Sequence, residues 1–313
     1  SMVEAIGSLA GGIPAITCFM SARGLPEALS APGVRIPSYA FPEQAAIALA
    51  HAVDHGEWRR RAVGTVPRFP GVRADEASAV IAGALERGDA WLGPDEITRL
   101  FACYGIPLAT TLQAETSEAA AEAAGSLHGP VALKAVGPVH KTDVGAVRLG
   151  LAATEVAAEA AAMTRRIAEH GEQLEGFVVQ EMVTGGVEMF VGMTADPEFG
   201  PIVACGAGGV TVELTRDVAV RVAPVSDLEA EEMVRSLATF PLLDGFRGAP
   251  TRDVKALEDV VLRVSALAVD QQAIVEMDCN PVIVLERGAA VVDARVRVAA
   301  PTPRTPFAGR ADA

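Results

Sequence analysis

Two lysines lie within eight residues of each other, in the segment from Val131 to Leu149. Lys134 ends an apolar run, Lys141 lies in the following Gly- and Pro-containing loop, and a strand pattern resumes at Gly145. Only three of the 26 Lys and Arg residues are lysines. A lysine ammonium is a compact point charge, whereas the Arg guanidinium is a planar fork. The pattern therefore predicts a hairpin that covers a polyphosphate with cations and backbone N–H groups.

A histidine lies in the same loop, where His140 directly precedes Lys141. A neutral imidazole beside lysines is able to act as a nucleophile toward a phosphoryl group. A solvated loop that binds nothing remains the alternative interpretation of these residues. We interpret the other four histidines, in helices or near caps, as structural or surface residues: His51, His55, His128 and His170.

A group of acids near the C-terminal end suggests a metal site. Glu276 and Asp278 alternate along a predicted strand, so their side chains share one face. Asn280 follows them, and Asp293 ends the next predicted strand. Hard oxygen ligands of this kind suit Mg²⁺, which takes one or two carboxylates together with phosphate oxygens and water. The alternative is an Asn-Pro turn with solvated acids.

A third group resembles a hinge that holds a base. Gln180-Glu181-Met182-Val183 is followed by two glycines and then by Glu188. An adenine ring is able to hydrogen-bond to hinge backbone groups and to stack on Met182, and a carboxylate such as Glu188 suits ribose hydroxyls. A plain hairpin with an exposed acid is the open alternative.

A glycine cluster, Gly206-Ala-Gly208-Gly209, is a further candidate for an anion contact. A lone cluster of this kind is weak support for a phosphate site, because many such loops are only tight turns. Glu213 and Asp217 follow it, and either is a candidate to bind a metal or to support a ligand.

The elements that must position these residues divide the chain into four parts. Residues 1–62 read as strand, helix, strand and helix, which predicts the closing part of a flavodoxin-like parallel α/β domain. Residues 63–90 are expected to be a linker with a helix. Residues 91–300 hold alternating helices and strands, and the Pro- and Arg-rich residues 301–313 are expected to be a disordered tail.

Composition limits the class of protein. The length of 313 residues favours two domains, and the net charge of −14 argues against a nucleic-acid binder, which needs a basic face. Four cysteines without a CxxC pair predict reduced thiols of a cytoplasmic protein. No apolar run is long enough to span a membrane. Ser1-Met2 resembles a cleavage scar, so we expect a piece of a longer protein.

Several motifs in order resemble one family, the NDP-forming acyl-CoA synthetases, which are relatives of succinyl-CoA synthetase. The resemblance covers about residues 91–300, the family's ATP-grasp domain, while Ile36–Glu43 resembles the end of its CoA-ligase domain. The motifs are Glu96 with Tyr104-Gly105-Ile106-Pro107, Val131-Ala-Leu-Lys134, His140-Lys141-Thr-Asp143-Val-Gly145, Glu188 with Asp196-Pro197-Glu198-Phe199-Gly200-Pro201, Gly206-Ala-Gly208-Gly209-Val-Thr-Val-Glu213, and Asp278-Cys-Asn280-Pro281 with Asp293-Ala-Arg295.

The resemblance implies an α/β fold, an α+β ATP-grasp domain preceded by the end of a flavodoxin-like domain. It implies the reaction acyl-CoA + ADP (or GDP) + phosphate ⇌ carboxylic acid + CoA + ATP (or GTP), through an acyl phosphate and a phosphohistidine. It implies ATP or ADP and Mg²⁺ as cofactors. The residues it implicates are Lys134 and the loop His140–Gly145 with Lys141 for phosphates, Glu181, Met182 and Val183 for adenine, Glu188 for ribose, Asn280 and Asp293 for Mg²⁺, and Asp278 and His140 for the phosphohistidine chemistry.

Some family features are missing from this chain. We find neither the Gly-flanked motif of the main phosphohistidine nor a CoA-binding Rossmann domain, Ala146 replaces an expected glycine, and the spacing from Lys134 to His140 is short. The chain alone is therefore not expected to turn over acyl-CoA. Its expected partners are CoA-binding and CoA-ligase domains or a subunit that carries the phosphohistidine, with CoA and a small carboxylic acid as substrates of the whole enzyme.

Two other functions remain open on the sequence. ATP-grasp regions of this kind also occur fused to acetyltransferases, where they sense a ligand without ligase turnover. A free-standing carboxylate–amine ligase is the third interpretation. The acyl group, the choice between ATP and GTP, and a homo-oligomeric state also stay open.

Overall fold

The computed structural model describes residues 16–18, 37–137, 145–209 and 217–300, and the chain divides into two units at Val63 and Gly64. In the first unit, β1 (Thr17–Cys18) pairs in parallel with β2 (Ser38–Tyr39). Helix α2 (Pro42–Arg60) follows, with Pro at its first turn, where the missing N–H has no partner to lose. Its only buried residue is Ala45.

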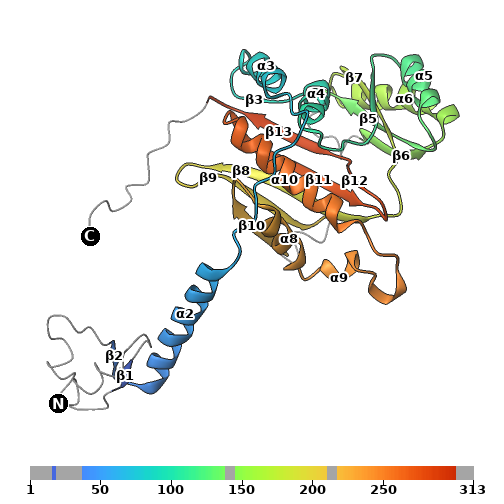
Figure 1. Cartoon of the computed structure of the whole chain (residues 1–313). Helices are drawn as coiled ribbons and strands as arrows, with labels where there is room; N and C mark the ends of the chain where they lie inside the picture. The colour runs from blue at the N-terminus through green and yellow to red at the C-terminus, as the bar shows by residue number, and fades with distance from the viewer. Residues whose placement is uncertain (1–15, 19–36, 138–144, 210–216, 301–313) are drawn as a thin grey trace, which may run out of the picture. The chain divides into compact units, whose positions relative to one another are not determined.

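The second unit contains a small antiparallel sheet with the strand order β4-β7-β5-β6 (Figure 1). Its strands are β4 (Thr111–Ala114), β7 (Gly176–Glu181), β5 (Val131–Val136) and β6 (Val147–Leu151). Helices α5 (Ser117–Ser126) and α6 (Ala153–Glu169) pack together and against the sheet, and Thr116 caps α5 by accepting a hydrogen bond from the Ala119 N–H at 3.1 Å. The expected hairpin of β5 and β6 is confirmed.

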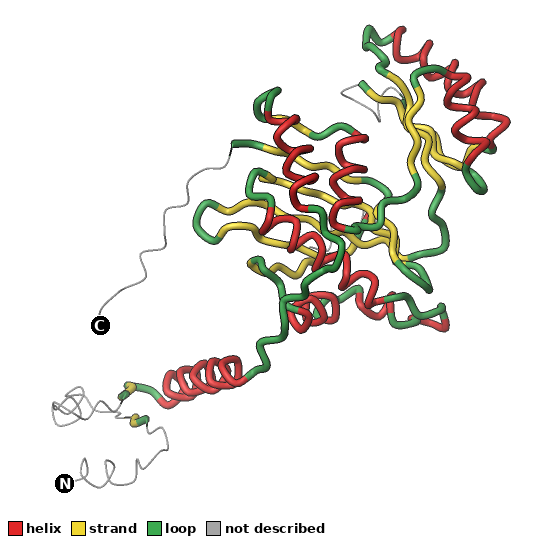
Figure 2. Tube along the Cα trace, turned by 45° about the horizontal axis from the view of Figure 1, so that its top comes forward, coloured by secondary structure: helices red, strands yellow, loops and turns green. Residues whose placement is uncertain are grey.

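The second unit also contains a larger antiparallel sheet with the order β10-β9-β8-β11-β13-β3, and β12 pairs with β11. Its strands are β3 (Ala90–Trp91), β8 (Val187–Asp196), β9 (Gly200–Ala207), β10 (Val218–Val222), β11 (Ile274–Val284), β12 (Ala289–Val291) and β13 (Ala294–Val298). Figure 2 shows helices along one side of these strands. The helices of this part are α3 (Ala74–Leu85), α4 (Pro94–Tyr104), α8 (Asp227–Arg235), α9 (Phe240–Leu243), η3 (Phe246–Gly248) and α10 (Val254–Asp270).

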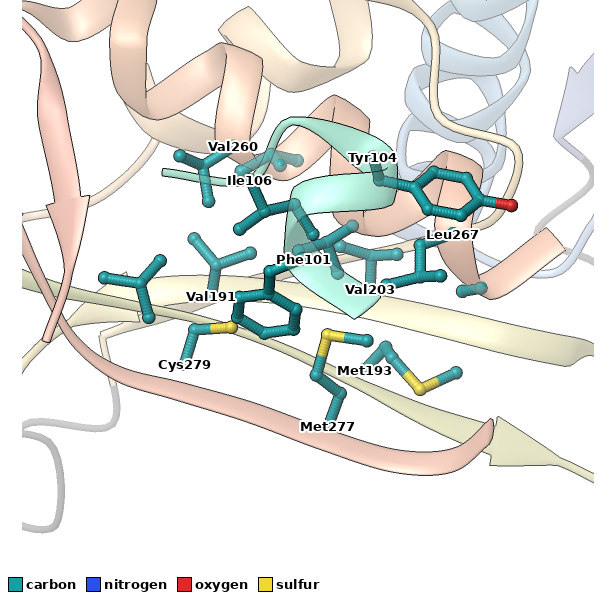
Figure 3. Close-up of a cluster of buried hydrophobic side chains, with 14 of the residues drawn as sticks. Phe101, Tyr104, Ile106, Val191, Met193, Val203, Val260, Leu267, Met277 and Cys279 are labelled. Atoms are coloured by element: carbon teal, nitrogen blue, oxygen red, sulfur yellow. The ribbon is translucent and has the colours of Figure 1, made fainter. Parts of the chain in front are cut away.

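The main core lies between this sheet and its helices. Helix α10 packs on β8 and β9, and α4 contributes Phe101, which is fully buried. Figure 3 shows the Phe101 ring directed toward the sheet, beside the Val191 and Cys279 side chains. Gly105 ends α4 with a left-handed φ of 64°, as expected from the Tyr-Gly-Ile-Pro sequence. The smaller sheet has its own core, which is richer in alanine.

Three elements differ from what the sequence pattern favours, which is Asp75 as the cap of a helix over Glu76–Arg87, a helix that starts at Trp91 and, as the alternative to a metal site, a turn at Asn280-Pro281. Asp75 is not a helix cap, because α3 begins at Ala74 and Arg73 precedes it. The Asn280-Pro281 pair is not a turn between two strands, because β11 continues through it with a shift in its pairing to β8. The short β3 was expected to be part of a helix start, yet Ala90 and Trp91 pair with β13. Long-range pairing overrides local turn preference at these positions.

Candidate functional site

The candidate site begins with Lys134, which β5 places opposite Val147 of β6 and Val178 of β7. Lys134 alternates with the buried residues Leu133 and Ala135, so its side chain lies on the face of the sheet away from theirs. Its Nζ atom donates to the Val292 carbonyl at 3.4 Å and lies 3.9 Å from Asp293 Oδ1. The small sheet therefore places the Lys134 ammonium beside the segment between β12 and β13.

Backbone hydrogen bonds hold that segment in place. The Val291 N–H donates to the Pro107 carbonyl at 2.7 Å, and the Ala109 N–H donates to the Val291 carbonyl at 2.8 Å. Its C-terminal end is tied to β11, because the Asn280 N–H donates to the Asp293 carbonyl at 3.0 Å. The target of the lysine is thus a fixed strand connection, and Asn280 and Asp293 are brought together as expected.

A second side chain of the small sheet reaches the same carbonyl. Gln180 of β7 is 3% exposed, and its Nε2 atom donates to the Val292 carbonyl at 2.9 Å and to Thr111 Oγ1 at 3.1 Å. Its Oε1 atom is buried and has no hydrogen-bond partner among the described residues. The sequence analysis placed Gln180 at the start of the hinge segment but gave its side chain no contact of its own. A single amide in the otherwise apolar strand Phe177–Gln180 was the signal that could have identified it.

The acidic residues lie on one face of β11, as the alternation predicts. Met277 and Cys279 are buried, whereas Glu276 and Asn280 are half-buried and Asp278 is exposed. Although Asp278 keeps exposed surface, the surrounding chain desolvates its carboxylate in part, which raises its pKa above the ordinary value of 3.8. The positive charge of Arg295 opposes this shift, and the negative charges of Asp293 and Glu276 add to it.

Asn280 and Asp293 are the candidate ligands for a divalent cation. The described residues contain no group of three His, Cys, Asp or Glu side chains placed to hold a metal ion. Asp293 offers an exposed carboxylate, with 56% of its side chain accessible, and Asn280 offers an amide oxygen. One carboxylate and one amide fit Mg²⁺, which takes its remaining ligands from phosphate and water. They do not fit a metal site built entirely from protein ligands.

The hinge residues follow Gln180 directly. The Glu181 N–H donates to the Thr110 carbonyl at 2.9 Å, and the Met182 N–H donates to the Pro130 carbonyl at 3.1 Å. In the part of the chain that the structure describes, the Val183 N–H has no protein acceptor. All three residues are half-buried. The hinge therefore offers one backbone donor to a ligand, at Val183.

Glu188 lies at the start of β8, beside the glycine cluster. Its carbonyl accepts a hydrogen bond from the Gly208 N–H at 2.9 Å, and its carboxylate lies so close to Gly209 that a Cβ there would be 2.5 Å from Oε2. The side chain is exposed, as a ribose ligand would require. Glycine at position 209, with a φ of 66°, leaves room for the Glu188 carboxylate.

Of the remaining predicted residues, the structure describes Gly145 and Asp217. His140, Lys141 and Glu213 lie outside the described residues. Gly145 is described, with a φ of 62°, and its carbonyl accepts a hydrogen bond from Arg166 at 3.3 Å. Asp217 accepts hydrogen bonds from the Ala238 and Thr239 N–H groups and from the Thr239 hydroxyl, so it anchors the connection between α8 and α9.

Comparisons with known proteins identify the fold of this site. The ATP-grasp domain family matches residues 83–298. Acetate–CoA ligase [ADP-forming] I from Archaeoglobus fulgidus is 36% identical over 292 residues, which cover 91% of this chain and 42% of that protein. The β subunit of Acetate–CoA ligase [ADP-forming] I from Pyrococcus furiosus is 36% identical over 206 residues, with coverage of 64% of this chain and 89% of that subunit.

A solved structure agrees with these relatives. Acetyl-coenzyme A synthetase 1 of Ca. Korarchaeum cryptofilum, in complex with coenzyme A and Ca-AMPCP, is 38% identical and superposes with a TM-score of 0.67. The match covers 71% of this chain and 99% of that one. The chain spans 42% and 38% of the length of two ligases that it matches, the one from Archaeoglobus fulgidus and a 4-hydroxybutyrate–CoA ligase [ADP-forming] from Nitrosopumilus maritimus. None of the helices in the described ranges has the length and apolar character needed to cross a membrane.

Proposed function

Because this chain belongs to the ATP-grasp family, among the relatives of ADP-forming acyl-CoA ligase β subunits, we propose that it is the nucleotide-binding and phosphoryl-transfer part of such a ligase. The observation that carries the proposal is the position of Lys134. Its ammonium is sheltered, with 19% of the side chain exposed, and it lies where a strand connection, Asp293 and the hinge strand β7 meet.

This arrangement suits a nucleotide. Lys134 neutralises charge on the phosphates, Val183 donates its N–H to the base, and Glu188 binds the ribose hydroxyls. Lys141 and Gly145 complete the phosphate contacts from the loop between β5 and β6. Phosphoryl transfer needs little covalent help from a protein, so positioning and charge neutralisation supply most of the catalysis.

Asn280 and Asp293 are the residues that would hold Mg²⁺, which would offset the negative charge of the phosphates. Asp293 also pairs with Lys134, so the cation-binding carboxylate and the phosphate-binding ammonium are within 3.9 Å of each other. Asp278 is proposed to orient a phosphorylated histidine. His140 is proposed as a second phosphorylated histidine.

The complete enzyme requires further parts. A histidine nitrogen attacks the γ-phosphorus of ATP, the bond to the β-phosphate oxygen breaks, and ADP leaves. The phosphoryl group then passes to a small carboxylic acid, and the CoA thiol displaces phosphate from the acyl phosphate. We assign the histidine and the CoA site to a CoA-ligase part, of which residues 1–62 are the closing portion, and residues 91–300 to the ATP-grasp part.

The regulatory alternative receives no support from the relatives, since those reported above are named as ligases or synthetases. Three buried cysteines carry free thiols, which is consistent with a reducing, cytoplasmic location: Cys103, Cys205 and Cys279.

The proposal is tested by thermal unfolding of the chain with Mg-ATP, Mg-ADP, Mg-GTP and ATP in EDTA, with Mg-tripolyphosphate as the control for general anion effects. A ligand at 100 times its dissociation constant stabilises by about 2.7 kcal/mol, which corresponds to a Tm shift of about 5 to 10 °C. We expect this shift with Mg-ATP and a smaller one in EDTA. No shift with any nucleotide, or an equal shift with tripolyphosphate, would contradict the proposal.

A further inference from the structure

The side-chain oxygen of Gln180 is a buried polar atom near the site that the proposed function does not use. Gln180 is 3% exposed, and its Oε1 atom makes no hydrogen bond within the described ranges. Buried polar atoms without partners are rare, because an unmade hydrogen bond is costly. The Nε2 atom of this amide has two acceptors, whereas its Oε1 atom lacks a donor among the described residues.

The orientation of this amide is fixed by its surroundings. Nε2 donates to the Val292 carbonyl at 2.9 Å and to Thr111 Oγ1 at 3.1 Å. The Thr111 hydroxyl donates its own hydrogen to the Ala109 carbonyl at 2.7 Å, so toward Gln180 it acts only as an acceptor. An amide rotated by 180° would place Oε1 against two acceptors. Oε1 is therefore held as a hydrogen-bond acceptor.

The position of the amide connects it to the nucleotide site. Gln180 lies opposite Ala132 of β5, and Lys134 is two residues further along the same strand, so both side chains extend from one face of the small sheet. Both reach the Val292 carbonyl. Gln180 also immediately precedes Glu181, the first hinge residue. The acceptor therefore lies between the hinge, which receives the base, and the lysine, which receives the phosphates.

We propose that Gln180 Oε1 accepts a hydrogen bond from the exocyclic amino group of adenine, and that Gln180 makes the site specific for adenine over guanine nucleotides. The inference rests on the proposed nucleotide binding. Adenine carries a donor at C6, whereas guanine carries a carbonyl oxygen there. Guanine would set an acceptor against a fixed acceptor, and a site built to bind an N–H group strongly disfavours a ligand without it.

The burial of Oε1 adds to this discrimination. The atom is shielded from solvent, so bulk water does not compete with a base for the same lone pair. The Val183 N–H supplies the complementary donor for a ring nitrogen of the base. One donor from the hinge backbone and one acceptor from Gln180 match the adenine edge.

The test compares three ligands by calorimetry, ATP, GTP and purine riboside triphosphate, the last of which lacks the 6-amino group. Wild-type protein is expected to bind ATP at least tenfold more tightly than either analogue. Gln180→Met removes the acceptor and should reduce the preference for ATP over purine riboside triphosphate to less than threefold.

Several results would overturn the assignment. If Gln180→Met weakened all three ligands equally, Gln180 would only tie the two sheets together. A wild-type protein that bound ATP and purine riboside triphosphate equally would also exclude the contact. If no nucleotide bound to wild-type protein, the proposed function itself would fail instead.

Urea unfolding identifies any variant that does not fold. Should Gln180→Met fail, Thr111→Val takes its place, since it removes one of the two acceptors that fix the amide. We expect its ATP-to-GTP affinity ratio to fall at least threefold, and an unchanged ratio would overturn the fixed-amide assignment.

Discussion

Two lysine–carboxylate pairs in the second unit have opposite arrangements. In the first, Lys134 is sheltered, with 19% of its side chain exposed, and Asp293 is 56% exposed at 3.9 Å. In the second, on α10, Lys255 is 71% exposed and Glu258 is 5% exposed at 2.7 Å. One pair therefore buries its cation and the other buries its anion.

The difference separates a binding pair from a structural pair. Lys255 lies 2.7 Å from Glu258, one helical turn away, and 3.7 Å from Glu231. Two carboxylates of the chain therefore already neutralise its charge. Lys134 lies on a β-strand and meets a carbonyl and a distant, solvated carboxylate. The sheltered ammonium of Lys134, which faces an exposed carboxylate, is suited to a charge-assisted contact with an incoming phosphate.

The largest expected effect is on ligand binding by the sheltered pair. Lys134→Met keeps the length of the side chain and removes the charge, and we expect it to weaken Mg-ATP binding by about 2 to 3 kcal/mol, roughly 30- to 150-fold. Calorimetric titration measures the change. Lys255→Met is the matched control, since it removes one of the other lysines and should leave the affinity within twofold. Equal losses in both variants would remove the distinction between the pairs.

The second expected effect is on stability, and it concerns the pair of Lys255 and Glu258. Lys255→Met leaves the buried Glu258 without its bonded partner, and we expect a loss of about 1 kcal/mol in the free energy of unfolding. This loss of stability is small because solvent screens the exposed ammonium of Lys255. Urea denaturation measures it. A loss at least as large in Lys134→Met would contradict the assignment of structural and binding roles.

The same pair predicts a pH dependence. The hydrogen bond to Glu258 raises the pKa of Lys255 above its ordinary value of 10.5. A cation with a raised pKa in the folded state stabilises fully below its unfolded pKa, and the contribution is lost as the pH rises through the folded value. The stability difference between wild type and Lys255→Met should therefore be constant near neutral pH and shrink above about pH 10.5. A difference that grew with pH would have the wrong sign.

The smallest expected effect is on stability at Asp293. Its carboxylate is mostly exposed and 3.9 Å from Lys134, so Asp293→Asn should change the free energy of unfolding by less than about 0.5 kcal/mol. Its effect should appear instead as a weaker dependence of ATP binding on Mg²⁺ concentration. A large stability loss, together with unchanged Mg²⁺ dependence, would assign Asp293 to the structural class with Lys255.

Local patterns predicted the parts of the fold that local forces decide. The hairpin of β5 and β6 followed from an apolar run on each side of a loop, and the Gly105 helix end followed from its φ preference. The alternation of Glu276 and Asp278 on β11 was also correct. These features depend on residues near one another in the chain.

Elements that depend on distant partners were predicted poorly. The Asn280-Pro281 pair has strong turn preferences, yet it lies inside β11, where pairing with β8 on one side and β12 and β13 on the other holds the strand extended. The two residues of β3 have no strand periodicity, and pairing with β13 alone makes them a strand. No local pattern carries this information.

The sequence by itself determined the chemistry of the candidate site. It determined that a rare lysine ends a buried strand, that oxygen ligands alternate on another, and that the motifs follow the order of an ATP-grasp family. Only the tertiary structure decided what Lys134 and Gln180 contact. Their common partner, the Val292 carbonyl, is 158 and 112 residues away. A backbone carbonyl has no sequence signature, so its role arises only when the small sheet packs against the connection between β12 and β13.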